Sequence, residues 1–196
     1  MTERQPPTEN PTRKAASAVT AIPMLWLFSD RRNDAWLPSA LERLPEGSAL
    51  VFRHYHLEGA ARRERFDTLA AIARVSGHCV ILSDTQQAAR DWGADGIYGP
   101  AALEPCADLI RLAAAHNGDE LQAANRAQVD GVFLSPVFAT ASHPGATSLG
   151  AMGFSVLAQQ SLVPVIALGG MTHARATQLD WPRWGAIDGL SRTNSA

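Results

Sequence analysis

Short apolar runs alternate with amphipathic stretches along the chain from residue 21 onward. The runs are rich in Val, Ile, Leu and Ala and are bounded by polar residues, Gly or Pro, which is typical of buried parallel strands. Between them, the stretch 60–76 places Phe66, Leu69, Ile72 and Val75 at helical spacing and predicts an amphipathic helix. The predicted strands cover 24–29, 49–53, 79–83, 96–98, 109–115, 131–135, 164–169 and 186–190. Further helices are predicted over 85–92, 120–127, 154–161 and 172–179.

This alternation predicts an α/β fold. Eight strands joined by crossover segments favour a compact (β/α)8 TIM-type barrel, with an open doubly wound sheet as the alternative. The chain ends six residues after the last predicted strand, so we expect the last helix to be missing. Residues 1–20 are polar and contain Pro6, Pro7 and Pro11, which indicates a flexible N-terminal tail. Residues 21–196 are predicted to form a single barrel domain.

Composition narrows the class of protein. A chain of 196 residues with 46% hydrophobic content and a net charge of -2 suits one domain with a sizeable core. No run approaches the roughly 20 apolar residues of a membrane helix, and the start lacks the apolar centre of a secretory signal, so we expect a cytoplasmic protein without a membrane partner. The pI of about 6.3 and the absence of a basic aromatic cluster argue against nucleic acid. The late Trp181 and Trp184 serve either ordinary packing or a contact in a homodimer.

Candidate chemistry is sought first at the strand ends, because active sites of closed βα barrels lie at the carboxyl ends of the strands. Gly169 and Gly170 end an apolar strand and precede a helix, so their amides could approach a phosphate closely. The alternative is a tight turn in which the glycines serve only packing. The position after the seventh strand favours a phosphate, and it brings in Ser191 from the turn after the eighth.

Other strand ends carry further polar side chains. The loop after residue 135 offers Thr140 and Ser142 as hydroxyl donors to an oxyanion, unless they satisfy the backbone of the loop itself. His116 and His143 could act as acid or base, although either could be structural. Asp84 either binds Mg2+ or caps the helix that follows it.

Two longer motifs resemble the thiamine phosphate synthase and thiazole tautomerase family. The stretch Asp130-Gly-Val-Phe-Leu-Ser-Pro-Val-Phe-Ala-Thr140 is similar to one strand and loop of the family, and Val163-Pro-Val-Ile-Ala-Leu-Gly-Gly-Met171 is similar to another. The resemblance covers nearly all of 25–190. The first motif, continued to Gly145, looks especially like the barrel domain that some bacteria fuse to a Nudix hydrolase.

The resemblance implies a reaction and a set of site residues. Synthases of this family join hydroxymethylpyrimidine diphosphate to thiazole phosphate with Mg2+, forming thiamine phosphate and pyrophosphate. It implies that Arg53 stands where the family's diphosphate-binding arginine stands, that Asp84 binds the metal, and that the phosphates are bound by Thr140, Ser142, Gly169, Gly170, Ser191 and Ser83. With His143 and His116, the acid or base candidates from the strand ends, Arg53 forms the predicted catalytic set. Tyr55 and His143 stand where the family has lysines, and 96–101 lacks its glutamine and aspartate. A metal-free thiazole tautomerase-like isomerase and a non-catalytic binder of thiazole or thiamine phosphate therefore remain alternatives to the synthase.

Overall fold

Eight parallel strands form a closed barrel in the computed structural model, which describes residues 22–140, 145 and 147–190. Neighbouring strands in the sequence pair with each other, and β1 pairs with β8 to close the ring. The (β/α)8 barrel is thereby confirmed and the open sheet is excluded. The strands are β1 (Leu25–Phe28), β2 (Ala49–Phe52), β3 (Cys79–Leu82), β4 (Gly96–Tyr98), β5 (Ile110–Ala115), β6 (Gly131–Leu134), β7 (Val165–Ala167) and β8 (Trp184–Ala186).

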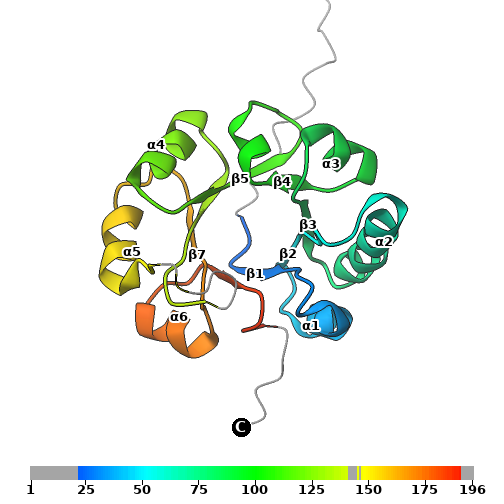
Figure 1. Cartoon of the computed structure of the whole chain (residues 1–196), viewed down its shortest axis with the longest axis horizontal. Helices are drawn as coiled ribbons and strands as arrows, with labels where there is room; N and C mark the ends of the chain where they lie inside the picture. The colour runs from blue at the N-terminus through cyan, green and yellow to red at the C-terminus, as the bar shows by residue number, and fades with distance from the viewer. Residues whose placement is uncertain (1–21, 141–144, 146, 191–196) are drawn as a thin grey trace, which may run out of the picture.

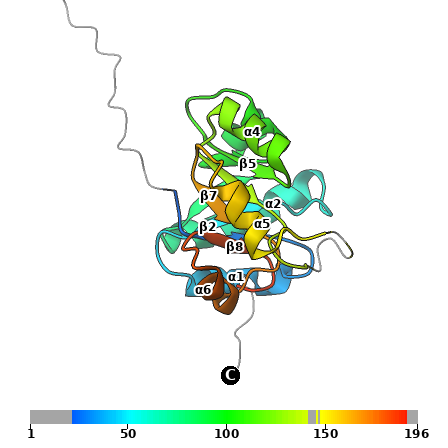
Figure 2. The same ribbon diagram turned by 90° about the vertical axis from the view of Figure 1, so that its left-hand side faces the viewer.

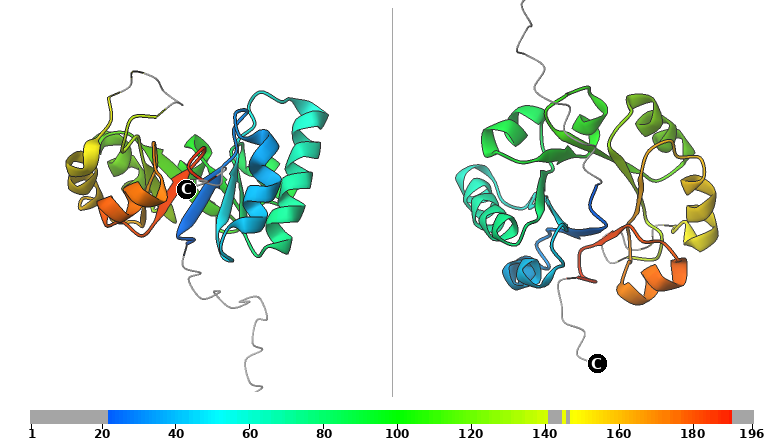
Figure 3. Two further views of the ribbon diagram at one scale, coloured as in Figure 1. Left: turned by 90° about the horizontal axis from the view of Figure 1, so that it is seen from below. Right: turned by 180° about the vertical axis from the view of Figure 1, so that it is seen from behind.

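Six α-helices surround the strands in the described part of the chain (Figure 1 and the right panel of Figure 3). No α-helix lies between β4 and β5, where a 3-10 turn, η2 (Pro100–Leu103), makes the connection. None follows β8 within the described residues, so the ring of helices is interrupted between α6 and α1. The helices are α1 (Leu37–Arg43), α2 (Gly59–Val75), α3 (Gln86–Trp92), α4 (Gly118–Ala127), α5 (Gly150–Ala158) and α6 (His173–Leu179).

The inside of the barrel is filled by side chains. Trp26, Phe28 and Phe133 lie fully buried at its centre, with edge-to-face ring contacts at 5.3 Å and 5.0 Å between centroids. Two outer clusters pack the strands against the helices, one over α1, α2 and α3 and the other over α4, α5 and α6. Figure 2 shows α5 and α6 on the outside of the barrel near β7 and β8. A filled centre leaves the rims of the barrel as the places for a ligand.

The eighth strand differs from the prediction over 186–190. It covers Trp184–Ala186, and Gly189 lies in a turn so close to Met171 that a Cβ on it would stand 2.3 Å from the Met171 carbonyl oxygen. The prediction was wrong because it took the apolar residues of this turn for strand. The α1 helix was not predicted, and α5 begins four residues before the predicted 154.

None of the described helices is long and apolar enough to cross a membrane. The predicted tail, 1–20, lies outside the described residues.

Candidate active site at the barrel mouth

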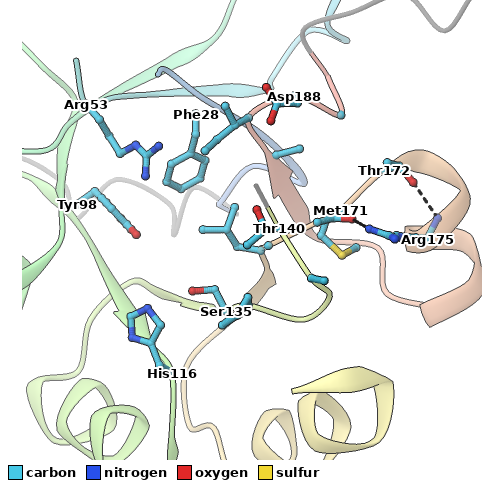
Figure 4. Close-up of a pocket in the computed structure, with 18 residues that line it drawn as sticks. Phe28, Arg53, Tyr98, His116, Ser135, Thr140, Met171, Thr172, Arg175 and Asp188 are labelled. Carbon is cyan, nitrogen blue, oxygen red and sulfur yellow. Dashed lines mark hydrogen bonds between the residues drawn. The ribbon is translucent and has the colours of Figure 1, made fainter. Parts of the chain in front are cut away.

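A cavity of about 350 Å³ opens at the carboxyl ends of the strands. Every strand except β3 contributes a lining residue, either from the strand itself or from the segment that follows it. Residues far apart in sequence therefore meet in this cavity (Figure 4). Its polar lining includes Arg53 after β2, Tyr98 of β4, His116 after β5, Ser135 and Thr140 after β6, Thr172 and Arg175 beyond β7, and Asp188 after β8.

The glycine pair after β7 lies in the wall of this cavity. Gly169 and Gly170 both have left-handed φ angles, +92° and +63°, and their carbonyls are used by Phe138 N–H and by the Arg175 guanidinium. A Cβ on Gly169 would lie 2.6 Å from Pro136 Cα. Within the described residues, neither glycine amide donates a hydrogen bond. The two N–H groups are therefore available to an anion, as a phosphate cradle requires.

Arg175 is a cation that the sequence reasoning missed. It donates to the Gly170 carbonyl, its guanidinium lies 4.9 Å from the centre of the Phe138 ring, and its own amide is capped by the Thr172 hydroxyl at 3.3 Å. Its signal in the sequence was a helix that begins directly after the glycine pair, with an arginine in its first turn. Arg175 thus lies across the cavity from Arg53 (Figure 4).

Arg53 is held over the mouth by the end of β1. Its Nε donates to the Ser29 carbonyl at 3.2 Å, its Nη2 donates to Asp30 at 3.0 Å, and the guanidinium lies over the Phe28 ring. Burial opposes ionisation of Asp30, but hydrogen bonds from Arg32 and the nearby Arg53 charge keep the pKa of Asp30 below its usual value. The guanidinium therefore carries a fixed charge in a fixed place.

Asp84 does not lie where the metal prediction requires. Its carboxylate forms an ion pair with Arg62 and accepts a hydrogen bond from Thr85 N–H at 2.7 Å. These bonds hold the pKa of Asp84 below its usual value even though burial opposes ionisation. Asp84 is absent from the cavity lining, and the described residues contain no group of three His, Cys, Asp or Glu side chains that could hold a metal ion. Within the described part of the chain, the donors do not fit the Mg2+ that the resemblance implies. The alternative, that Asp84 caps the following helix, is wrong as well: the N-cap of α3 is Thr85, whose hydroxyl accepts from Ala88 N–H.

Asp84 is unavailable to a metal because of an arginine on α2. Arg62 donates to the carbonyls of Arg53 and Ser83, both at 3.0 Å, as well as to Asp84. Its guanidinium therefore joins the ends of β2 and β3 and occupies the carboxylate that would otherwise face a cation. Ser83 is likewise engaged: its hydroxyl is 2.6 Å from the Tyr55 hydroxyl and is not part of the cavity lining.

We expect Arg62→Met to lower the free energy of unfolding by about 2–4 kcal/mol, because it keeps the apolar stem but leaves a carboxylate and two carbonyls without their donor. Urea unfolding measures this loss. Arg63→Met is the matched control, since Arg63 is an exposed neighbour paired with Asp67, and should change stability by less than about 0.5 kcal/mol. Equal losses in the two variants would contradict the interpretation.

The remaining predicted residues divide into two groups. His116 and Thr140 line the cavity, and the His116 ring is 2.7 Å from Glu120 through Nδ1. Ser142, His143 and Ser191 lie outside the described residues.

The fold and the cavity define a closed parallel α/β barrel with a ligand pocket at the carboxyl ends of its strands. A family model described as thiamine monophosphate synthase matches residues 25–181, and the chain belongs to this family. The family resemblance of the sequence is thereby confirmed, whereas the narrower likeness to a Nudix-fused domain stays a prediction.

Individual relatives agree with this assignment. The thiamine-phosphate synthase of Azorhizobium caulinodans is 30% identical over 160 residues, which cover 75% of this chain and 76% of the relative. That of Chloroflexus aurantiacus is 29% identical over 163 residues, covering 78% and 74%. The solved structure of thiamine phosphate pyrophosphorylase from Pyrococcus furiosus superposes with a TM-score of 0.68 at 20% identity, covering 90% of this chain and 91% of that one. The last comparison supports the fold.

Proposed function

We propose that this chain is a transferase of the thiamine phosphate synthase type, which condenses hydroxymethylpyrimidine diphosphate with thiazole phosphate to thiamine phosphate and pyrophosphate. One observation carries the proposal: a single cavity is lined both by the glycine pair with its available amides and by Arg53, which lies across it from Met171, the residue that follows the pair (Figure 4). Family membership gives the substrates, and this arrangement supplies one anion site at each side of the cavity.

The proposed roles follow from this placement. The ring nitrogen of the thiazole attacks the methylene carbon of the pyrimidine while the bond from that carbon to the diphosphate oxygen breaks. Negative charge develops on the departing oxygens, so a fixed cation beside them lowers the barrier. The groups assigned to the two anions are Gly169, Gly170 and Ser191 for the thiazole phosphate, and Arg53, Thr140, Ser142 and His143 for the diphosphate.

Mg2+ is implied by the resemblance alone, the donors among the described residues do not fit it, and none of the proposed residue roles depends on it. Ser83 and Asp84 are better assigned to holding the ends of the strands than to binding a substrate or metal, since each is engaged by a neighbouring side chain. A cytoplasmic location and a homodimer stay predictions as well.

The direct test is a condensation assay on the purified chain with both substrates and Mg2+, in which thiamine phosphate is measured by fluorescence after oxidation. We expect product at a rate that scales with enzyme concentration. Absence of product at high enzyme concentration, with tight calorimetric binding of thiazole phosphate, would instead identify a binder that does not catalyse the transfer.

A second candidate, the metal-free isomerase, has one observation in its favour. The His116 ring lines the cavity, and its Nδ1 lies within hydrogen-bond distance of Glu120, which leaves Nε2 for a proton of the substrate. Isomerisation of a thiazole phosphate that persists in a chelator and fails in His116→Ala would support this candidate over the synthase.

A further inference from the structure

A series of hydrogen bonds through His54 and Ser29 links the Asp34 carboxylate to the backbone of Arg53. The His54 ring is 2.7 Å from Asp34 Oδ1 through Nε2 and 2.8 Å from Ser29 Oγ through Nδ1. Ser29 Oγ in turn accepts the Arg53 backbone N–H at 2.8 Å. The Ser29 and His54 residues are 0% and 1% exposed, so the bond between them is shielded from water, whereas the Asp34 side chain at the far end is 37% exposed.

Arg65 of α2 fixes the far end of this series. Its guanidinium donates to the Asp34 carboxylate and to the Asp34 carbonyl, both at 2.7 Å. Burial opposes ionisation of Asp34, but the hydrogen bonds from His54 and Arg65 keep its pKa below the usual value. Asp34 is therefore an ionised carboxylate, which accepts hydrogen bonds only.

The direction of each bond follows from that carboxylate. Because Asp34 only accepts, His54 Nε2 carries a proton. Burial lowers the pKa of His54, against the effect of Asp34, so at neutral pH the ring is neutral and Nδ1 is an acceptor. The Ser29 hydroxyl then donates to Nδ1, and its lone pairs point to the Arg53 N–H. The ring thus sets which way the hydroxyl points, and the hydroxyl holds the Arg53 backbone.

The backbone geometry agrees with a positioning role. His54 has a left-handed φ of +34°, which is unfavourable for a residue with a side chain. Its ring stacks on Phe52 with centroids 4.8 Å apart. A turn closed by Leu57 N–H donating to the His54 carbonyl begins at this residue, directly after Arg53.

The same three residue types form the catalytic triad of serine hydrolases, but this arrangement cannot act as one. Ser29 is fully buried and is not part of the cavity lining, and its oxygen already accepts from Arg53 N–H. No substrate carbonyl could reach it. In the hydrolase triad the serine bonds to Nε2 and the carboxylate to Nδ1, which is the reverse of the order seen at His54.

We propose that His54 is a positioning residue that acts through Ser29 to hold Arg53 toward the anion in the barrel mouth. This inference rests on the proposed function in so far as Arg53 meets the diphosphate.

Two substitutions of His54 separate the contact with Ser29 from the contact with Asp34. In His54→Asn the side-chain amide oxygen reaches the place of Nδ1 and can still accept from the Ser29 hydroxyl. Asparagine also tolerates the left-handed φ at this position. The longer amide of His54→Gln reaches the place of Nε2 and keeps the bond to Asp34. Ser29→Ala removes the hydroxyl without changing the His54 backbone. Thermal unfolding first establishes that each variant is folded.

Calorimetric titration with pyrophosphate is the first readout. We expect Ser29→Ala and His54→Gln to bind about tenfold more weakly than the wild type, and His54→Asn to stay within about threefold. In an Arg53→Ala background, Ser29→Ala should cause no further loss. Equal affinities of Ser29→Ala and the wild type, or equal weakening by His54→Asn and His54→Gln, would overturn the inference.

A second readout needs no ligand. The Arg53 Nε–H signal in the NMR spectrum, assigned by its loss in Arg53→Ala, reports the hydrogen bond from Nε to the Ser29 carbonyl. We expect its exchange with water to quicken in Ser29→Ala and His54→Gln and to stay slow in His54→Asn. Unchanged exchange in all three would refute the positioning role even if pyrophosphate does not bind, whereas failure of binding with altered exchange would count against the proposed function alone.

Discussion

Arg53→Ala should lower kcat/KM for the condensation by about 100- to 1,000-fold, the usual loss when a fixed donor to developing negative charge is removed. Arg53 lines the same cavity as the glycine pair, with its side chain only 17% exposed and its guanidinium fixed by Ser29 and Asp30. Steady-state kinetics with both substrates measures the loss. Pyrophosphate affinity should fall in parallel, because the same charge meets the product.

The control for this prediction is Arg63→Ala. Arg63 lies on the exposed side of α2 and pairs with Asp67 at 2.8 Å, so its removal alters the net charge equally without touching the cavity. Its kcat/KM should stay within about twofold of the wild type, since exposed charges act weakly at a distance in salt. A folded Arg53→Ala variant with the kinetics of Arg63→Ala would rule out the assigned role of Arg53.

The strands were predictable because both of their faces are buried. A strand that packs against the barrel centre on one face and against helices on the other has apolar residues at nearly every position, as in β3 and β6. The same rule misplaced the eighth strand, because the turn around Gly189 is also apolar and is set by close packing on Met171. The α1 helix has only seven residues, too few for its helical period to be evident.

Site positions were predictable to the extent that the barrel itself determines them. Residues after β2, β5 and β7 face one rim in any such barrel, and Arg53, His116 and Gly169 do line its cavity. The hydrogen-bond and ion-pair partners of these residues were not predictable from the sequence. The ion pair of Asp84 joins residues 22 apart in sequence, and spacing along the chain gave no indication that Arg62 would turn back onto the strand end. The same holds for His54, whose partners Ser29 and Asp34 come from the segment around β1.

Gly170→Ala should both destabilise the barrel and weaken binding of thiazole phosphate. An added Cβ would lie 2.6 Å from the Ala139 carbonyl oxygen, and the φ of +63° is strained for any L side chain. We expect a loss of about 2–4 kcal/mol in unfolding free energy, from the strain and the displaced loop together. Affinity for thiazole phosphate should fall more than about tenfold, because the displaced amides no longer converge on one anion.

Gly150→Ala separates the two effects. Gly150 has nearly the same φ, +65°, but a Cβ there would meet nothing within 4 Å, so this variant carries the backbone strain without the collision. It should lose about 1 kcal/mol of stability and keep the affinity of the wild type. Calorimetry with thiazole phosphate measures the affinity of both variants, and urea unfolding measures their stability. If Gly170→Ala binds thiazole phosphate as tightly as Gly150→Ala does, the amides of the glycine pair are not the phosphate cradle, and the anion must be held elsewhere in the mouth.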